Sequence, residues 1–150
     1  MSLLAARLAG LLLCLFSLFV GAAPGADSSG LVAIPSLTAR VTDLTATLSG
    51  DQKAVLEQQL ADLEARKGAQ LVVLILPTTQ PEAIEQFSIR LFEAWKVGRK
   101  GVDDGVMLIV AKDDRRLRIE VGYGLEGALN DAIAKRIISE TITPFFKNGD

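Results

Sequence analysis

Apolar residues recur at helical spacing in three segments of the chain, and each segment predicts an amphipathic helix. Ser49 and Gln52 have the spacing of a capping box, so the first helix is expected to begin there. Pro81 stands where the second helix would begin, at the helical position that tolerates proline best. The predicted helices lie between Ser49 and Gly68, between Pro81 and Gly98, and between Asn130 and Pro144.

Aliphatic runs of strand length alternate with these helices. Residues 71–76 form a continuous run that ends at Pro77, as expected of a strand covered by helices on both faces. Residues 106–111 and 117–121 form two more runs, and residues 39–44 can form a short first strand. The order strand, helix, strand, helix, hairpin, helix predicts a single α/β domain with a mixed sheet covered by helices.

The last two predicted strands have a definite register if Asp113 and Asp114 form the turn between them. Three apolar pairs then face each other: Val106 with Val121, Leu108 with Ile119, and Val110 with Leu117. A slip of one residue would move these side chains to the other face, so the apolar pairs support the register. The other face of the second strand is charged, with Arg116, Arg118 and Glu120, which predicts an edge strand with one face in water.

Residues 1–23 have the three-part pattern of a secretory signal, with an apolar run at 8–20 and small residues at 21–23. The apolar run is shorter than the ~20 residues that a membrane-spanning helix needs, and an uncleaved anchor is the alternative. Cys14 follows Leu13 rather than a small residue, so we interpret it as part of the signal and not as a lipidation site. The protein is therefore expected to be exported, to the periplasm or the extracytoplasmic face of the membrane.

Composition limits the chemistry of the remaining chain. Residues 24–38 are rich in Gly, Ser, Ala and Pro and predict a flexible lead-in, so the domain is expected to span residues 39–150. It contains no His, and the only Cys lies in the signal, which excludes disulfides and metal sites built from His or Cys. The net charge of −2, with a single Trp and a single Tyr for stacking, argues against a nucleic-acid-binding face.

The hairpin register predicts that two loops distant in sequence, residues 98–105 and 120–131, meet at its open end. Their polar residues are Arg99, Lys100, Asp103, Asp104, Glu120, Tyr123, Glu126 and Asp131. The loops also contain six glycines, which suggests backbone that adopts unusual angles or approaches a ligand closely. Converging carboxylates and loop carbonyls are the ligands of hard cations such as calcium or magnesium. The alternative is that these residues serve only as caps, turns and solvated charges.

Three other features have weaker functional interpretations. Asp43, near the end of the first strand, would add a carboxylate, although the sequence does not determine where it points. Residues 113–116, Asp-Asp-Arg-Arg, are explained by turn and edge-strand chemistry, with a functional role as the alternative. The Gly-rich run at 122–127 follows an antiparallel strand and therefore lacks the context of a dinucleotide-binding loop.

Four motifs of the chain match a known family. The first is Val41-Thr42-Asp43 followed by Leu48-Ser49, and the second is Gly68-Ala69-Gln70-Leu71-Val72-Val73. The third is Trp95-Lys96-Val97-Gly98-Arg99-Lys100-Gly101 with Asp104-Gly105-Val106. The most distinctive is Arg118-Ile119-Glu120-Val121-Gly122-Tyr123-Gly124-Leu125-Glu126-Gly127. Over roughly residues 40–150 the chain resembles the TPM domain family, which includes thylakoid proteins of photosystem II repair and proteins described as acid phosphatases.

The resemblance implies a three-layer α/β/α sandwich whose mixed sheet contains a β-hairpin edge. It implies an exported or membrane-associated protein, and because many members continue into a transmembrane helix and a Gly-rich tail, the chain is expected to be truncated before such a segment. Divalent-cation binding and acid phosphatase activity are ascribed to some members. The acidic motif positions of the family fall on Asp43, Asp103, Asp104, Glu120 and Glu126, which the resemblance makes candidate metal ligands.

Three functions are consistent with these observations. The favoured one is a calcium- or magnesium-binding accessory domain that maintains a membrane protein complex or another envelope protein, with membrane association through an uncleaved anchor or a missing C-terminal segment. The second is a metal-dependent acid phosphatase-type hydrolase of phosphate monoesters, with Asp104 or Asp103 as catalytic residue and with Arg99 and Lys100 as the phosphate clamp. The third is a purely structural protein-interaction domain. No nucleophile with a partner base can be recognised from spacing, so enzyme activity stays open.

Overall fold

The computed structural model describes residues 30–148, and this part of the chain forms one four-stranded sheet. The strands are β1 (Val41–Asp43), β2 (Gln70–Leu76), β3 (Gly105–Ala111) and β4 (Arg116–Val121), in that order across the sheet. β1, β2 and β3 are parallel, and β4 is antiparallel to β3. The mixed sheet with a hairpin edge is therefore confirmed, whereas the expectations for residues 1–29 lie outside the described part.

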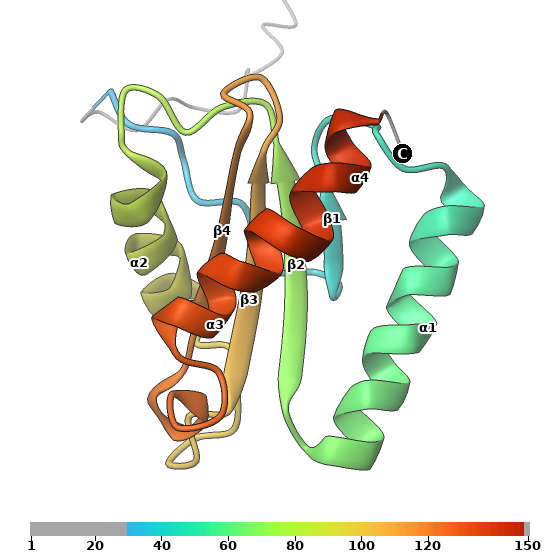
Figure 1. Ribbon diagram of the computed structural model, residues 1–150, viewed down its shortest axis with the longest axis vertical. Helices are drawn as coiled ribbons and strands as arrows, with labels where there is room; N and C mark the ends of the chain where they lie inside the picture. Colours follow the sequence, from blue (N-terminus) through green and yellow to red (C-terminus); the bar gives the residue numbers. More distant parts are fainter. Residues whose placement is uncertain (1–29, 149–150) are drawn as a thin grey trace, which may run out of the picture.

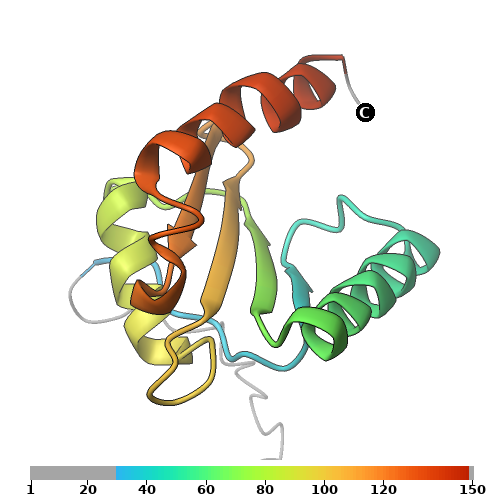
Figure 2. The same ribbon diagram turned by 60° about the horizontal axis from the view of Figure 1, so that its bottom comes forward.

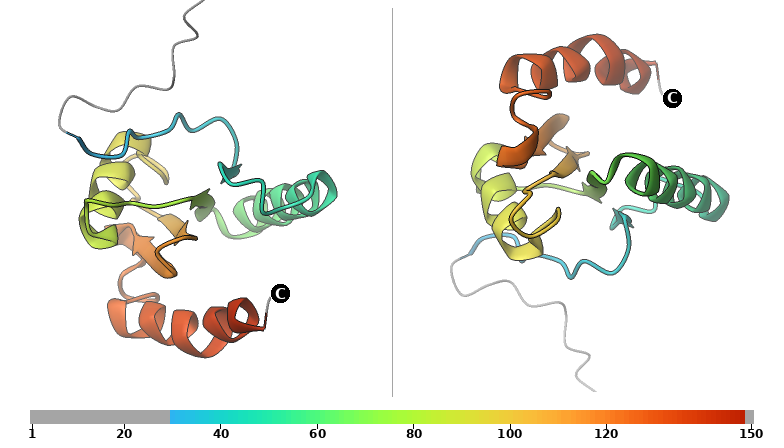
Figure 3. Two further views of the ribbon diagram at one scale, coloured as in Figure 1. Left: turned by 90° about the horizontal axis from the view of Figure 1, so that it is seen from above. Right: turned by 90° about the horizontal axis from the view of Figure 1, so that it is seen from below.

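Helices cover both faces of the sheet (Figure 1). They are α1 (Gly50–Lys67), α2 (Ile84–Trp95) and a C-terminal run of α3 (Asp131–Arg136), the π-helical η2 (Ile137–Ile142) and α4 (Thr143–Lys147), while a 3-10 turn, η1 (Tyr123–Leu125), follows β4. Figures 2 and 3 show α2 on one face and both α1 and the C-terminal run on the other. The three-layer α/β/α sandwich is confirmed. Among the described helices, none combines the length and the apolar character that crossing a membrane requires.

Two clusters of buried side chains join these layers. The larger lies between the sheet and α2, where Phe87 and Leu91 are fully buried against alternate residues of β2 and β3. The smaller lies under the C-terminal run, where Ala134 packs against Val106 and Ile119. Alternate strand residues thus serve opposite faces, as the two-residue period of a strand requires. The middle strands β2 and β3 are covered on both sides, which agrees with their continuous apolar sequence.

The hairpin has the predicted register. Val106 faces Val121, Leu108 faces Ile119, and Val110 faces Leu117. The predicted start of α1 is also confirmed, because the Gln52 amide donates to Ser49 Oγ over 3.2 Å and the Ser49 amide donates to Gln52 Oε1 over 2.8 Å. Gly68 ends α1 in the left-handed conformation, with a φ of 78°. Local signals therefore determined these features correctly.

The second helix begins later than predicted. Pro81 does not open it; α2 starts at Ile84 with Ala83 as its N-cap. The intervening residues form a turn, in which the Glu82 amide donates to the Thr79 carbonyl over 3.0 Å. Thr79 Oγ1 in turn donates to the Glu82 carbonyl over 3.0 Å. A threonine side chain that bonds to nearby backbone competes with helix formation, which explains the shift.

The third helix extends beyond its predicted end. Pro144 does not terminate it but lies in the first turn of α4, directly after the π-helical η2. A proline interrupts an α-helix because it lacks an amide donor and its ring crowds the carbonyl four residues earlier. The wider π turn shifts this pairing, so the chain continues to Lys147 as a helical run.

The described part of the predicted lead-in has no helix or strand but contacts α2. Trp95 Nε1 donates to the Pro35 carbonyl over 2.7 Å, and Arg90 Nη2 donates to the Val32 carbonyl over 2.9 Å. Val32 and Ile34 pack against the larger core cluster. Residues 32–35 therefore cover part of the α2 side of the domain.

Candidate functional site

The two loops that were predicted to meet do meet. The Gly122 amide donates to the Gly105 carbonyl over 2.7 Å, and the Gly124 amide donates to the Asp103 carbonyl over 3.0 Å. A Cβ atom on Gly122 would lie 2.2 Å from the Asp103 carbonyl oxygen, and one on Gly124 would lie 1.9 Å from that of Val102. The glycines are needed here because the loop backbones are in direct contact, which leaves no room for a Cβ atom.

Asp104 is held inside this loop pair by Arg99. Its side chain is buried, with one oxygen accepting from the Arg99 amide over 2.8 Å and the other from Arg99 Nε over 2.7 Å. The hydrogen bond from the Arg99 side chain, followed by the one from its amide, holds the pKa of the Asp104 carboxyl below its usual range. A role for Asp104 as nucleophile or metal ligand would therefore require this mutual contact to break. The same holds for a role of Arg99 as phosphate clamp.

Asp43 lies at the opposite end of the sheet from the loop pair. It pairs with Ile75 near the end of β2, whereas Gly105 pairs with Gln70 at the start of β2. The Asp43 carboxylate accepts hydrogen bonds from the Thr45 amide (2.9 Å), from Thr45 Oγ1 (2.7 Å) and from the Leu48 amide (2.8 Å). Burial alone would raise the pKa of Asp43, but these hydrogen bonds outweigh it and lower that pKa. Asp43 therefore caps the loop before α1 and is not brought together with the other predicted ligands.

Arg99, which pairs with Asp104, is exposed, and so are three further residues of the predicted site, Lys100, Asp103 and Glu126. Asp103 has a φ of 54°, and its carbonyl accepts the hydrogen bond from Gly124. Lys100 and Glu126 form no ion pair within the described residues. These side chains are therefore available to a ligand, whereas those of Asp43 and Asp104 are engaged within the domain.

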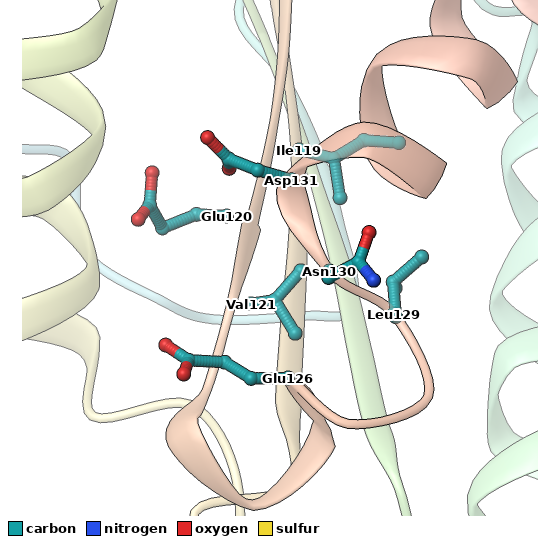
Figure 4. A pocket seen from close by; sticks show the side chains of 7 residues that line it. All are labelled: Ile119, Glu120, Val121, Glu126, Leu129, Asn130 and Asp131. Atoms are coloured by element: carbon teal, nitrogen blue, oxygen red, sulfur yellow. The ribbon is translucent and has the colours of Figure 1, made fainter.

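A pocket of about 350 Å³ opens where β4 faces the loop that leads into α3. It is lined by Ile119, Glu120, Val121, Glu126, Leu129, Asn130 and Asp131. The three acidic residues come from β4, from the end of η1 and from the first turn of α3, and Figure 4 shows their carboxyl groups on the same side of the pocket. No basic side chain belongs to the lining, so we name it the acidic pocket.

The three carboxylates of the acidic pocket differ in the hydrogen bonds and ion pairs that they already form within the domain. Glu120 Oε2 accepts hydrogen bonds from Ser88 Oγ over 2.8 Å and from Arg118 Nε over 3.1 Å. Asp131 is largely exposed, with Lys135 Nζ 3.8 Å away on the next turn. Glu120 thus forms a fixed wall of the pocket, while Glu126 and Asp131 form its exposed rim.

Comparison with known proteins places the domain in a family. The sequence profile of the TPM domain matches residues 41–150. The chain belongs to the TPM domain family. No curated protein matches this sequence.

Two solved structures share the fold of this TPM domain. The N-terminal domain of a protein from P. gingivalis is 35% identical, with a TM-score of 0.67 over 75% of this chain and 71% of that chain. The N-terminal domain of a Corynebacterium glutamicum protein is 17% identical, with a TM-score of 0.58 over 79% of this chain and 75% of that chain. The second, at its lower identity, shows the fold alone.

The structure changes the predicted ligand set of this TPM domain. Of the five predicted carboxylates, only Glu120 and Glu126 line the acidic pocket. Asp131 joins them; the sequence placed it among the polar residues of the two loops but not among the candidate metal ligands. Within residues 30–148, no three acidic side chains are close enough together to hold a metal ion as they stand. The predicted Asn130 cap is present, because the Ile133 amide donates to Asn130 Oδ1 over 3.1 Å, and it places Asp131 in the first turn of α3.

Proposed function

We propose that this TPM domain is an exported accessory module that binds a calcium or magnesium ion at the acidic pocket. The observation that carries the proposal is the lining itself: Glu120, Glu126 and Asp131 line one pocket from three segments of the chain, and no lysine or arginine belongs to that lining. Carboxylate and amide oxygens are the donors that hard cations prefer, and the lining provides these donors without any nitrogen or sulfur ligand.

Because no three acidic side chains in residues 30–148 are close enough together to hold a metal ion directly, the proposal is for an ion that keeps part of its water shell. Magnesium usually retains several waters and binds through one or two carboxylates, and calcium also accepts water among its ligands. Glu126 and Asp131 on the rim would contact the ion or its water shell, and the Asn130 side-chain oxygen is engaged as the cap of α3. Glu120, already hydrogen-bonded to Ser88 and Arg118, would contribute mainly its negative charge.

The accessory role is proposed from the export that the sequence predicts. The sequence pattern of residues 1–23 supports export, and an envelope or membrane protein complex is the class of partner that an exported binding domain would serve. We do not propose the phosphatase alternative, because the candidate residues Asp104 and Arg99 occupy each other's hydrogen-bonding groups.

Amide NMR during a calcium titration, repeated with magnesium, tests the proposal. We expect saturable shifts confined to β4, η1 and the start of α3, with an apparent dissociation constant of about 1 mM or below, the range of extracellular calcium modules. The double variant Glu126→Gln/Asp131→Asn removes the rim charges and should abolish these shifts.

The matched control removes two acidic charges elsewhere, as Asp51→Asn/Asp62→Asn on α1. It should titrate like the parent chain, because only the net charge changes. Shifts scattered over the surface, or equal weakening in both double variants, would mean general charge screening and would contradict a cation site at the pocket.

A further inference from the structure

A second groove lies at the opposite end of β4, where the hairpin turn meets the last helix. It has a volume of about 570 Å³ and is lined by Val110, Ala111, Lys112, Arg115, Arg116, Leu117, Thr143, Phe146 and Lys147. The lining contains apolar residues and four basic residues but no acidic one. We name it the basic groove.

The four cations of the basic groove form no close ion pair within the described residues, although Asp114 is near enough to attract Arg116 electrostatically. Lys112, Arg115, Arg116 and Lys147 are exposed, and none forms an ion pair with a residue in the range 30–148. The neighbouring Asp114 instead accepts hydrogen bonds from Thr78 Oγ1 over 2.8 Å and from the Thr79 amide over 2.9 Å. Asp114 thereby ties the turn to the loop after β2 and leaves the groove with an excess of positive charge.

Phe146 belongs to the groove lining, and Phe145 precedes it on α4. Phe145 is 56% exposed and Phe146 is 48% exposed, although both lie within a helix of the folded domain. Exposed aromatic rings next to lysine and arginine are typical of surfaces that enter the interface of a membrane, where the rings reach the acyl boundary and the cations meet anionic head groups.

The groove also lies where the chain enters the domain. Figure 1 shows the first described residues, the β3–β4 turn and the end of α4 at the same end of the long axis, and η1 with its loop at the other. The sequence before this entry point contains the apolar run at residues 8–20. A chain tethered by this run would enter the domain at the same end as the basic groove.

We propose that the basic groove docks onto the anionic surface of a lipid bilayer. Lys112, Arg115, Arg116 and Lys147 bind the head groups, and Phe145 and Phe146 insert at the level of the acyl boundary. The acidic pocket then faces away from the membrane, so anionic lipid head groups do not compete with it for a cation. This proposal is independent of cation binding at the acidic pocket.

Flotation with lipid vesicles tests the docking surface. A chain that begins at Pro24 avoids insertion of the apolar run, and both cores lie within residues 30–148; the related domains were also solved as isolated N-terminal domains. In EDTA and low salt, we expect it to bind vesicles that contain phosphatidylglycerol but not vesicles of pure phosphatidylcholine. High salt should release it because screening weakens surface electrostatics.

Charge and ring variants locate the contact. Each basic residue near an anionic surface strengthens membrane binding about fivefold, so Arg115→Gln/Lys147→Gln should weaken binding about 30-fold. Phe145→Ser/Phe146→Ser should weaken it about tenfold through lost apolar burial. The matched control, Arg66→Gln/Lys67→Gln, removes the same charge from the end of α1, at the other end of the molecule (Figure 1), and should bind like the parent chain.

Two results would overturn the docking surface. Equal losses in the groove and control variants would reduce the effect to net charge. Binding to soluble polyglutamate without binding to anionic vesicles would assign the groove to an acidic protein segment instead. Because every arm contains EDTA, failure here leaves the calcium titration of the acidic pocket unaffected.

Discussion

The acidic pocket and the basic groove share two elements, β4 and the C-terminal helical run, and differ in charge. Both lie between β4 and the helical run at residues 131–147, at opposite ends. β4 contributes Glu120 to the pocket and Arg116 to the groove, while the helical run contributes Asp131 at its start and Lys147 at its end. The helical part of this polarity agrees with the helix dipole, which favours acidic residues in the first turn and basic residues in the last.

The two sites also differ in how much of their charge is already bound. Glu120 accepts hydrogen bonds from Ser88 and Arg118, and Asp131 has Lys135 nearby, whereas the four cations of the groove have no ion pair within residues 30–148. A charge that is unpaired on the surface is available to an outside partner without breaking an internal contact. The basic groove is therefore the site from which we expect the larger response to charge removal.

The largest expected effect comes from disrupting the contact between residues 98–105 and 120–131, next to the acidic pocket. Gly122→Ala places a Cβ atom 2.2 Å from the Asp103 carbonyl, so the backbone must shift. We expect the free energy of unfolding in urea to fall by about 3 kcal/mol, as for an overpacked site. The control is Gly127→Ala, because a Cβ atom there meets nothing within 4 Å.

Gly122→Ala also separates the two sites. Cation shifts at the acidic pocket should disappear in the variant, while vesicle binding through the basic groove should persist in the fraction that stays folded. If Gly122→Ala proved as stable as Gly127→Ala, the close contact between the loops would be wrong.

A smaller effect concerns acid stability. Arg99 lowers the folded-state pKa of Asp104, so the carboxylate contributes stability above its unfolded pKa of about 4 and loses it as the pH falls through the folded value. Asp104→Asn should therefore lower stability at neutral pH and flatten the loss of stability below about pH 5. Urea midpoints measured across this range provide the readout.

Arg99→Gln provides the matching partner variant. It removes the main cause of the lowered pKa, so the double variant should show little additional flattening beyond either single change. Strictly additive pH effects would instead show that Asp104 and Arg99 act independently.

The smallest expected effect sharpens the interpretation of the acidic pocket. Asp131→Asn removes a charge from the first turn of α3 and weakens an exposed contact with Lys135. We expect the free energy of unfolding to change by at most about 0.5 kcal/mol, because exposed helix pairs and dipole contacts contribute little. Thermal unfolding of Asp131→Asn beside the parent chain measures this; a large loss would make the cation test depend on folding.

Sequence patterns were sufficient for most of the fold and for part of the candidate site. The capping box at Ser49, the Gly68 stop and the hairpin register were correct because each depends on residues that are close along the chain. The prediction that residues 98–105 meet 120–131 followed directly from that register. The helix boundaries predicted from Pro81 and Pro144 were wrong. The Thr79 side chain bonds to the backbone before α2, and a π-helical segment precedes Pro144.

The sequence by itself determined the sheet, the helices, the closeness of the two loops and an acidic character at one end of β4. Only the tertiary structure decided which charges are available. Arg99 satisfies Asp104, and Asp43 caps its own loop, whereas Asp131 reaches the acidic pocket and Lys147 the basic groove. The reason is that period, caps and turns encode neighbours along the chain, while the partner of a charged side chain depends on packing between segments that are distant in sequence.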